Sequence, residues 1–155
     1  MNSYLFPGLE LGPIAIRRIL AALPAASLDA KVDPNRFSPR EIIAHLADWE
    51  PILLDRMRTS RDTPGETLYG HDEAVMAEQN GYRESDPMAQ AELYLRRRGE
   101  TLAWLKTLAA DDWDKVGVHE ERGPMTVRDQ ANMMLGHELY HIEQLTSYLS
   151  QLSWS

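Results

Sequence analysis

A chain of 155 residues with 43% hydrophobic and 26% charged side chains has the composition of a soluble globular protein, and we expect one domain over residues 1–155. The chain has no cysteine, which excludes disulfides, thiolate metal ligands and cysteine nucleophiles. Its net charge of −8 argues against nucleic-acid binding, because phosphate recognition depends on Lys and Arg. We find no signal-peptide pattern and no stretch long enough to span a membrane, so a cytoplasmic protein without a membrane partner is predicted.

Hydrophobic periodicity predicts four helices and almost no strand. The first covers residues 9–23. The second begins where Ser38 caps a helix that starts at Pro39, with Glu41 closing a capping box, and it continues to about residue 58. Pro51 lies inside this helix and is expected to kink it, because proline removes one backbone hydrogen bond.

The third helix is predicted to begin after Asp86 and to reach about residue 108, and the fourth to run from a capping box at Thr126 to about residue 152. The link over residues 61–85 is far longer than a normal bundle turn. It could cross the whole bundle, so the second and third helices could run parallel. The predicted fold class is all-α, a four-helix bundle with one long crossover.

The stretch His137-Glu138-Leu139-Tyr140-His141 matches H-E-x-x-H, the helical signature of zinc peptidases. Two histidines four positions apart share one face of a helix and can reach one divalent metal. A peptidase needs a third ligand downstream, and the downstream sequence supplies none at the usual spacings. We therefore reject the peptidase interpretation and look for a third ligand elsewhere.

His45 is the candidate third ligand. It lies two turns into the second predicted helix, at the edge of its apolar arc, and His137 and His141 lie at a similar edge of the fourth. Three histidines so placed could converge inside a bundle, and three protein ligands with open positions are typical of a catalytic metal site. Asp48, one turn from His45, is either a hydrogen-bond partner for an imidazole N–H or a solvent-facing aspartate.

Glu138 falls in the middle of the apolar arc of the fourth helix. A buried carboxylate is costly unless it is paired, protonated or facing a metal. Two interpretations stay open from the residues alone: a structural buried hydrogen bond, or a general base that serves a nucleophile at the metal.

Three segments resemble the DinB-like superfamily, which includes the bacterial thiol S-transferases and the metal-binding domain of mycothiol-dependent maleylpyruvate isomerase. They are HLADWE, DDWDKVGVHEERGPMTVRD and HELYHIEQL. The resemblance implies a bundle of up-down-down-up connectivity, frequent homodimers, and one divalent metal, usually zinc or nickel. It also implies that His45, His137 and His141 hold this metal.

The predicted function is that of a divalent-metal-dependent enzyme. Its three-histidine site would activate a small nucleophile, a low-molecular-weight thiol or water, for transfer to or hydrolysis of a small-molecule substrate, with Glu138 as the candidate catalytic residue. The alternative is a non-catalytic metal-binding module for stress response or ligand binding. Arg56 is a candidate for binding a carboxylate, whereas His71 and His119 are expected to be incidental loop histidines.

Two surface predictions complete the analysis. The run Arg96-Arg97-Arg98 on the third helix is expected to be a solvated face. Leu135, Leu139 and Ile142 form an apolar strip turned away from His137, and it could contact a neighbouring helix or a second subunit. We expect a homodimer.

Overall fold

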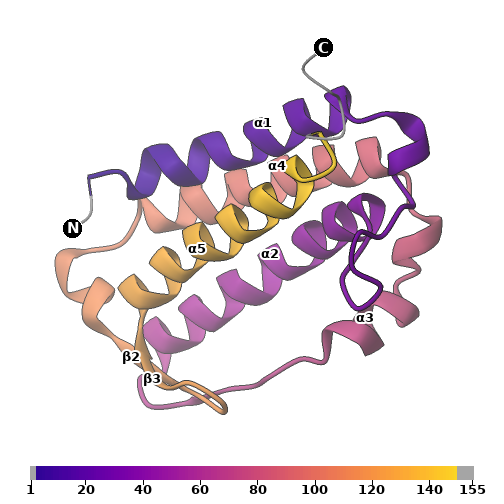
Figure 1. The fold of residues 1–155 in the computed structure, drawn as a ribbon. Coiled ribbons are helices and arrows are strands. Elements are labelled where there is room, and N and C mark those ends of the chain that lie inside the picture. The colour runs from indigo at the N-terminus through magenta and orange to yellow at the C-terminus, as the bar shows by residue number, and fades with distance from the viewer. Residues whose placement is uncertain (1–2, 150–155) are drawn as a thin grey trace.

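The computed structural model describes residues 3–149 and is mostly helical (Figure 1). The α-helices are α1 (Leu5–Ala22), α2 (Pro39–Asp62), α3 (Glu73–Gln79), α4 (Pro87–Leu105) and α5 (Val127–Thr146). The strands are β1 (Thr67–Leu68), β2 (Val116–His119) and β3 (Gly123–Thr126). Short 3-10 turns occur at Ala25–Ser27, Tyr82–Glu84 and Ala110–Asp114.

The four long helices form the predicted four-helix bundle (Figure 1). Following the colour along the chain, α1 and α5 run in one direction, whereas α2 and α4 run in the opposite direction. The segment between α2 and α4 carries β1 and α3 back along the length of the bundle, which is what allows α2 and α4 to run parallel. No helix among the described residues is long and apolar enough to cross a lipid bilayer.

The predicted helix starts are confirmed at the capping residues. The Ser38 hydroxyl accepts a hydrogen bond from the Glu41 backbone N–H, and the Glu41 carboxylate accepts one from the Ser38 backbone N–H. Thr126 and Asp129 form the same reciprocal pair at the start of α5. Each box satisfies backbone donors that have no partner within the helix.

The other helix boundaries were predicted less accurately. Helix α1 begins at Leu5 instead of residue 9, α2 continues to Asp62, and α4 ends at Leu105. Helix α5 ends at Thr146, and the part of its predicted range beyond residue 149 lies outside the described residues. The starts of α2, α4 and α5 have cap chemistry that can be recognised in sequence, whereas the start of α1 has no side-chain cap and the ends have no Gly C-cap to mark them.

The expectation that the arginine run is a solvated face is wrong for Arg98, which is 2% exposed, and Arg97 is half-buried.

The side chains of Arg97 and Arg98 donate hydrogen bonds to backbone carbonyls that two prolines inside helices leave without a partner. Pro51 cannot donate to the carbonyl of Ala47, and Arg97 Nη1 donates to that oxygen at 2.7 Å. In α1, Pro13 likewise leaves the Leu9 carbonyl free, and Arg98 Nη1 donates to it at 3.0 Å.

A three-stranded sheet, ordered β1-β2-β3, was not predicted. Strand β1 pairs parallel with β2, and β2 pairs antiparallel with β3. The strands are two to four residues long, and Gly117, Gly123 and Pro124 interrupt any alternating pattern. The sheet ties the crossover to the segment before α5, since residues of β1 and β2 come from these two links.

The predicted apolar strip on α5 divides between interior and surface. Leu135 and Ile142 are partly buried against the core, and the Leu135 side chain fills the space next to Gly8 of α1. Leu139 is 65% exposed. The first two residues therefore contact the protein's own helices, and a homodimer stays a prediction.

Gly12 in α1 provides a stability test, because a Cβ at this position would overlap the buried Glu138 carboxylate. Gly12→Ala should lower the free energy of unfolding by about 2 kcal/mol or more, as expected for overpacking in a dense interior. The matched control is Gly99→Ala in α4, where a Cβ would meet nothing within 4 Å. That substitution should raise the free energy of unfolding by about 1 kcal/mol. Equal effects in urea denaturation would contradict the packing at Gly12.

Candidate metal centre

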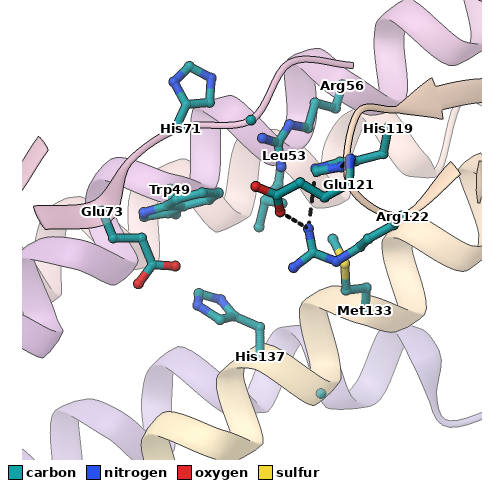
Figure 2. A pocket seen from close by; sticks show the side chains of 12 residues that line it. Trp49, Leu53, Arg56, His71, Glu73, His119, Glu121, Arg122, Met133 and His137 are labelled. Atoms are coloured by element: carbon teal, nitrogen blue, oxygen red, sulfur yellow. Dashed lines mark hydrogen bonds and ion pairs between the residues drawn. The ribbon is translucent and has the colours of Figure 1, made fainter. Parts of the chain in front are cut away.

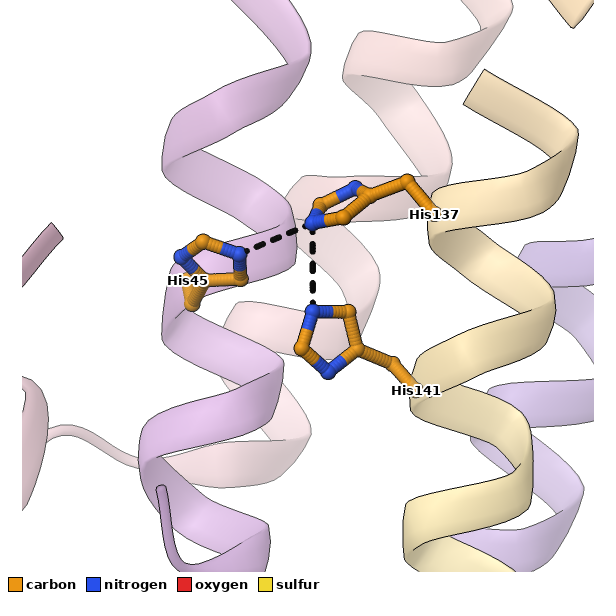
Figure 3. Close-up of side chains that lie close together, drawn as sticks. All are labelled: His45, His137 and His141. Atoms are coloured by element: carbon orange, nitrogen blue, oxygen red, sulfur yellow. Dashed lines mark hydrogen bonds between the residues drawn. The ribbon is translucent and has the colours of Figure 1, made fainter. Parts of the chain in front are cut away.

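Three imidazole rings from two antiparallel helices meet inside the bundle (Figure 3). His45 comes from α2, and His137 and His141 come from successive turns of α5. The Nε2 atom of His137 lies 3.0 Å from Nε2 of His45 and 3.1 Å from Nε2 of His141. The three histidines named from the sequence are therefore brought together by the fold.

The spacing of these nitrogens fits a shared divalent metal. Imidazole ligands bind zinc at roughly 2.0–2.1 Å, so two of them on one metal lie roughly 2.8–3.4 Å apart for angles between a right angle and a tetrahedral one. The observed separations of 3.0 and 3.1 Å fall in this range. Among residues 3–149, these three form the cluster of metal-type ligands that could hold an ion.

Gln144 fixes the tautomer of His141. The Gln144 Nε2 amide donates to the Phe37 carbonyl at 3.1 Å, which turns its Oε1 toward His141 Nδ1 at 3.2 Å. Because Oε1 can only accept, Nδ1 of His141 carries the proton and Nε2 presents its lone pair to the centre. The sequence analysis missed Gln144, although it lies on the same face of α5, three residues after His141.

Asp48 does not serve the centre as a hydrogen-bond partner. Its carboxylate accepts from Asn80 at 2.8 Å and from Arg97 at 3.3 Å. The Nδ1 atom of His45 is buried and has no hydrogen-bond partner among the described residues. The interpretation of Asp48 as a partner for an imidazole N–H is therefore wrong.

The environment keeps the imidazoles neutral. Burial lowers the pKa of His45 to about 2, and the neighbouring His141 and His137 lower it further in the same direction. Burial likewise lowers the pKa of His137 to about 4 and that of His141 to about 3. Neutral imidazoles are the form that binds a metal.

Glu138 belongs to a buried ionic network beside the three histidines. Arg98 Nε and Nη2 donate to the two oxygens of Glu50 at 2.7 and 3.0 Å, and Arg98 Nη1 lies 3.3 Å from both oxygens of Glu138. The Tyr94 hydroxyl donates to Glu138 and accepts from Arg98. Burial raises the pKa of Glu138, against the opposing effect of Arg98.

This network separates two apolar clusters of the core. One contains Leu9 and Met134, and the other contains Ile16 and Leu145. Along α1, α4 and α5, respectively, Gly12, Arg98 and Glu138 fall between the two clusters, and Tyr94 of the network belongs to the second cluster. The Glu138 carboxylate is thus directed toward α4, whereas His137 and His141 point toward α2 (Figure 3).

A cavity of about 330 Å³ opens beside the histidine cluster, with His137 in its wall (Figure 2). Four segments supply its lining: α2, the crossover, the β2–β3 hairpin and α5. The lining residues are Trp49, Leu53, Arg56, Gly70, His71, Glu73, His119, Glu121, Arg122, Met133, Gly136 and His137.

Trp49 connects the cavity to the histidine cluster. Its ring centroid lies 5.5 Å from that of His45, 6.3 Å from that of His137 and 6.1 Å from that of His71. His71 and His119 were expected to be incidental, yet both line the cavity, and His119 is buried. Sequence reasoning also missed Glu73, which begins the short helix α3 of the crossover, and Arg122, which lies between β2 and β3; neither carries a periodic signal.

Fold and site together define a helical bundle with a candidate three-histidine metal centre. The profile of the DinB superfamily matches residues 9–145. The chain belongs to the DinB superfamily.

Individual relatives agree with this assignment. YfiT from Bacillus subtilis (strain 168), described as a probable metal-dependent hydrolase, is 21% identical over 148 residues, which cover 95% of this chain and 83% of YfiT. The solved structure of YfiT, a four-helix bundle of unusual topology, superposes with a TM-score of 0.89 at 20% identity, covering 97% of this chain and 87% of YfiT.

Two further solved structures share the fold. Mycothiol-dependent maleylpyruvate isomerase matches with a TM-score of 0.73 and 16% identity over 91% of this chain and 59% of that enzyme. The DinB-like protein YjoA from Bacillus subtilis matches with a TM-score of 0.66 and 14% identity over 99% of this chain and 94% of YjoA.

Metal-free protein is expected to lose stability as the pH falls below about 6.5. The folded state holds His45 neutral with a pKa of about 2, whereas the unfolded chain titrates near the ordinary value of 6.5. The unfolded state therefore binds the proton first, and stability that is present above pH 6.5 is lost on acidification. His45 alone should account for about 2 kcal/mol by pH 5.

The measurement is urea unfolding of chelator-treated protein at pH 8 and pH 5, alongside His45→Gln. The carboxylates contribute equally in both proteins, so the variant should show the smaller loss. An identical pH dependence would mean that His45 is not held neutral by the fold.

Proposed function

We propose that this protein is a divalent-metal-dependent enzyme whose site is formed by His45, His137 and His141, with zinc or nickel as the metal. The single observation that carries the proposal is the convergence of three Nε2 atoms beside a cavity into which a small molecule fits. The substrate would be a small molecule, and the reaction a transfer or a hydrolysis.

The donor set supports a catalytic rather than a structural metal. Structural zinc sites are usually closed by four protein ligands, whereas three ligands leave a position for a reactant. His137 lies in the wall of the cavity, so a reactant in the cavity would reach the open side of the centre. When bound, the metal would polarise an electrophile and lower the pKa of the nucleophile.

We infer that the bundle does not need the metal to fold. Capping boxes, two apolar clusters and the Arg98 network hold the helices without contribution from the ion. A preformed frame of this kind is expected of a catalytic site, whereas a structural metal supplies folding free energy outright. This favours the enzyme over the non-catalytic module.

The relatives are consistent with either water or a thiol as the nucleophile. YfiT is described as a probable metal-dependent hydrolase, and the isomerase of similar fold depends on mycothiol. We propose that this chain activates water or a low-molecular-weight thiol in the same kind of site.

For proton transfer, Glu73 is better placed than Glu138. The Glu138 carboxylate already accepts hydrogen bonds from Tyr94 and Arg98, whereas Glu73 lines the same cavity as His137. Figure 2 shows the Glu73 carboxylate on the same side of the cavity as the His137 ring. Desolvation of its carboxylate raises the pKa of Glu73, which is the direction that favours a general base. We assign Glu138 to the framework that positions α5.

Metal content tests the centre. Untagged protein should hold about one zinc or nickel ion per chain by mass spectrometry, and His45→Ala, His137→Ala and His141→Ala should each abolish stoichiometric metal. His119→Ala is the matched control, because His119 is a buried histidine outside the cluster and should leave metal content unchanged. Absence of metal after reconstitution with both ions would refute the proposal.

Substitutions of Glu73 and of Glu138 are expected to have different effects on catalysis and on stability. In metal-loaded protein, Glu73→Gln should lower kcat for thiol transfer to a chlorodinitrobenzene or for hydrolysis of a nitrophenyl ester by roughly 100-fold. It should also remove the acidic limb of the pH–rate profile. Glu138→Gln should retain the shape of that profile and lower the free energy of unfolding by about 2 kcal/mol or more. A normal profile in Glu73→Gln would return the general-base role to Glu138.

A further inference from the structure

Arg56 is a buried cation whose side chain is only partly satisfied. It is 7% exposed, and its Nη2 donates to the Tyr69 carbonyl. Its guanidinium also lies over the Trp49 ring, with Cζ 5.4 Å from the centroid. Nε is buried without a hydrogen-bond partner, and no carboxylate among residues 3–149 forms an ion pair with this side chain.

The contrast with Arg98 shows how unusual this is within one chain. Arg98 is comparably buried and is neutralised by both Glu50 and Glu138. A buried charge is strongly destabilising unless a counter-ion or full hydrogen bonding compensates for it. Burial, reinforced by the positive charge of Arg122, lowers the pKa of Arg56. An anion near Arg56 would supply what the chain itself does not.

Arg56 faces the cavity that His137 also lines. Figure 2 shows Arg56, His119 and Arg122 toward one side of the cavity, and Trp49 and Glu73 toward the other. The indole Nε1 of Trp49 is a second buried donor without a partner. Arg56 and Trp49 both line the cavity, and each carries a hydrogen-bond donor without a partner, an arrangement that suits a ligand rich in acceptors.

The acidic residues near Arg56 are engaged elsewhere or lie farther away. Glu120 accepts from the Gly70 N–H at 2.7 Å, and Glu121 lies 3.7 Å from Arg122 on the exposed rim. Both attract Arg56 only at longer range. Glu73 lies toward the opposite side of the cavity in Figure 2. The cavity volume of about 330 Å³ lies at the small end of ligand pockets.

We propose that Arg56 binds an oxyanion group of the substrate, a carboxylate or a phosphate, while the reacting end of the same molecule lies at the three-histidine centre beside His137. The inference rests on the proposed function, since it deepens that site by naming a chemical class of substrate. Such substrates are small acids that carry a reacting group apart from the charged group.

The test uses succinate and inorganic phosphate as probes in chloride-free, low-salt buffer, with metal-free protein so that neither probe can bind an ion. Binding is measured by calorimetry. The variant is Arg56→Met, and the matched control is Arg58→Met on the same helix, which removes one positive charge paired with Asp55 on the surface. Arg56→Lys keeps the charge but loses the planar fork.

At least one probe should bind the wild type, and its affinity should fall about tenfold or more in Arg56→Met, the loss expected for a charge-assisted hydrogen bond. The affinity should be unchanged in Arg58→Met and intermediate in Arg56→Lys. Succinamide, the neutral counterpart of succinate, should not bind. The melting temperature of Arg56→Met should rise by a few degrees, because an unpaired buried charge is removed.

Equal binding of succinate or phosphate to wild type and Arg56→Met would overturn the proposal, as would the absence of binding by both probes. Metal content of the same variants separates this failure from failure of the proposed function. If the protein binds metal but neither probe, the proposed metal centre stands and only the anion subsite is contradicted. If the protein binds a probe through Arg56 but never binds metal, the proposed metal centre is contradicted instead.

Discussion

The buried guanidinium of Arg98 connects the four long helices inside the core. One side chain neutralises Glu50 of α2 and Glu138 of α5, and it also donates to the Leu9 carbonyl of α1. It therefore joins all four long helices, since Arg98 itself belongs to α4. A carboxylate or a carbonyl buried without this donor would cost several kcal/mol, so the four helices have one arrangement in which these groups are all satisfied. The neighbouring position of α5 carries His137, so the network that fixes Glu138 also fixes the candidate metal centre.

Local chemistry accounts for what the sequence predicted correctly. Ser38 with Glu41 and Thr126 with Asp129 are short-range signals, and both mark the starts of helices in the structure. The three histidines were found because imidazoles at helical spacing have a recognised ligand chemistry. What failed depended on contacts between distant segments. The burial of Arg98 follows from Pro13 and Glu138, which lie far away in the chain, so its charge pattern alone indicated solvent. The strands were too short to leave an alternating pattern, and they form because two long links meet.

Asp48 and Gln144 show the same limit within the site. Asp48 lies one turn from His45, but Asn80 and Arg97 occupy its carboxylate. Gln144 reaches His141 because its own amide is held by the Phe37 carbonyl, a residue more than a hundred positions earlier. Sequence spacing indicates which side chains could meet on one helix. Which of them are free to do so depends on competing partners that only the fold supplies.

The origin of the cavity wall has a consequence for how this architecture can diversify. Its histidine centre stands on two long helices, whereas His71 and Glu73 come from the crossover, and His119 and Arg122 come from the hairpin before α5. Links of this kind accept substitution and changes in length more readily than packed helices do. Changes in these two segments could thus alter the lining of the cavity while the candidate metal centre stays unchanged. Under the proposed function, the cavity could be adapted through these links while His45 and Arg56, which both belong to α2, keep their positions relative to each other.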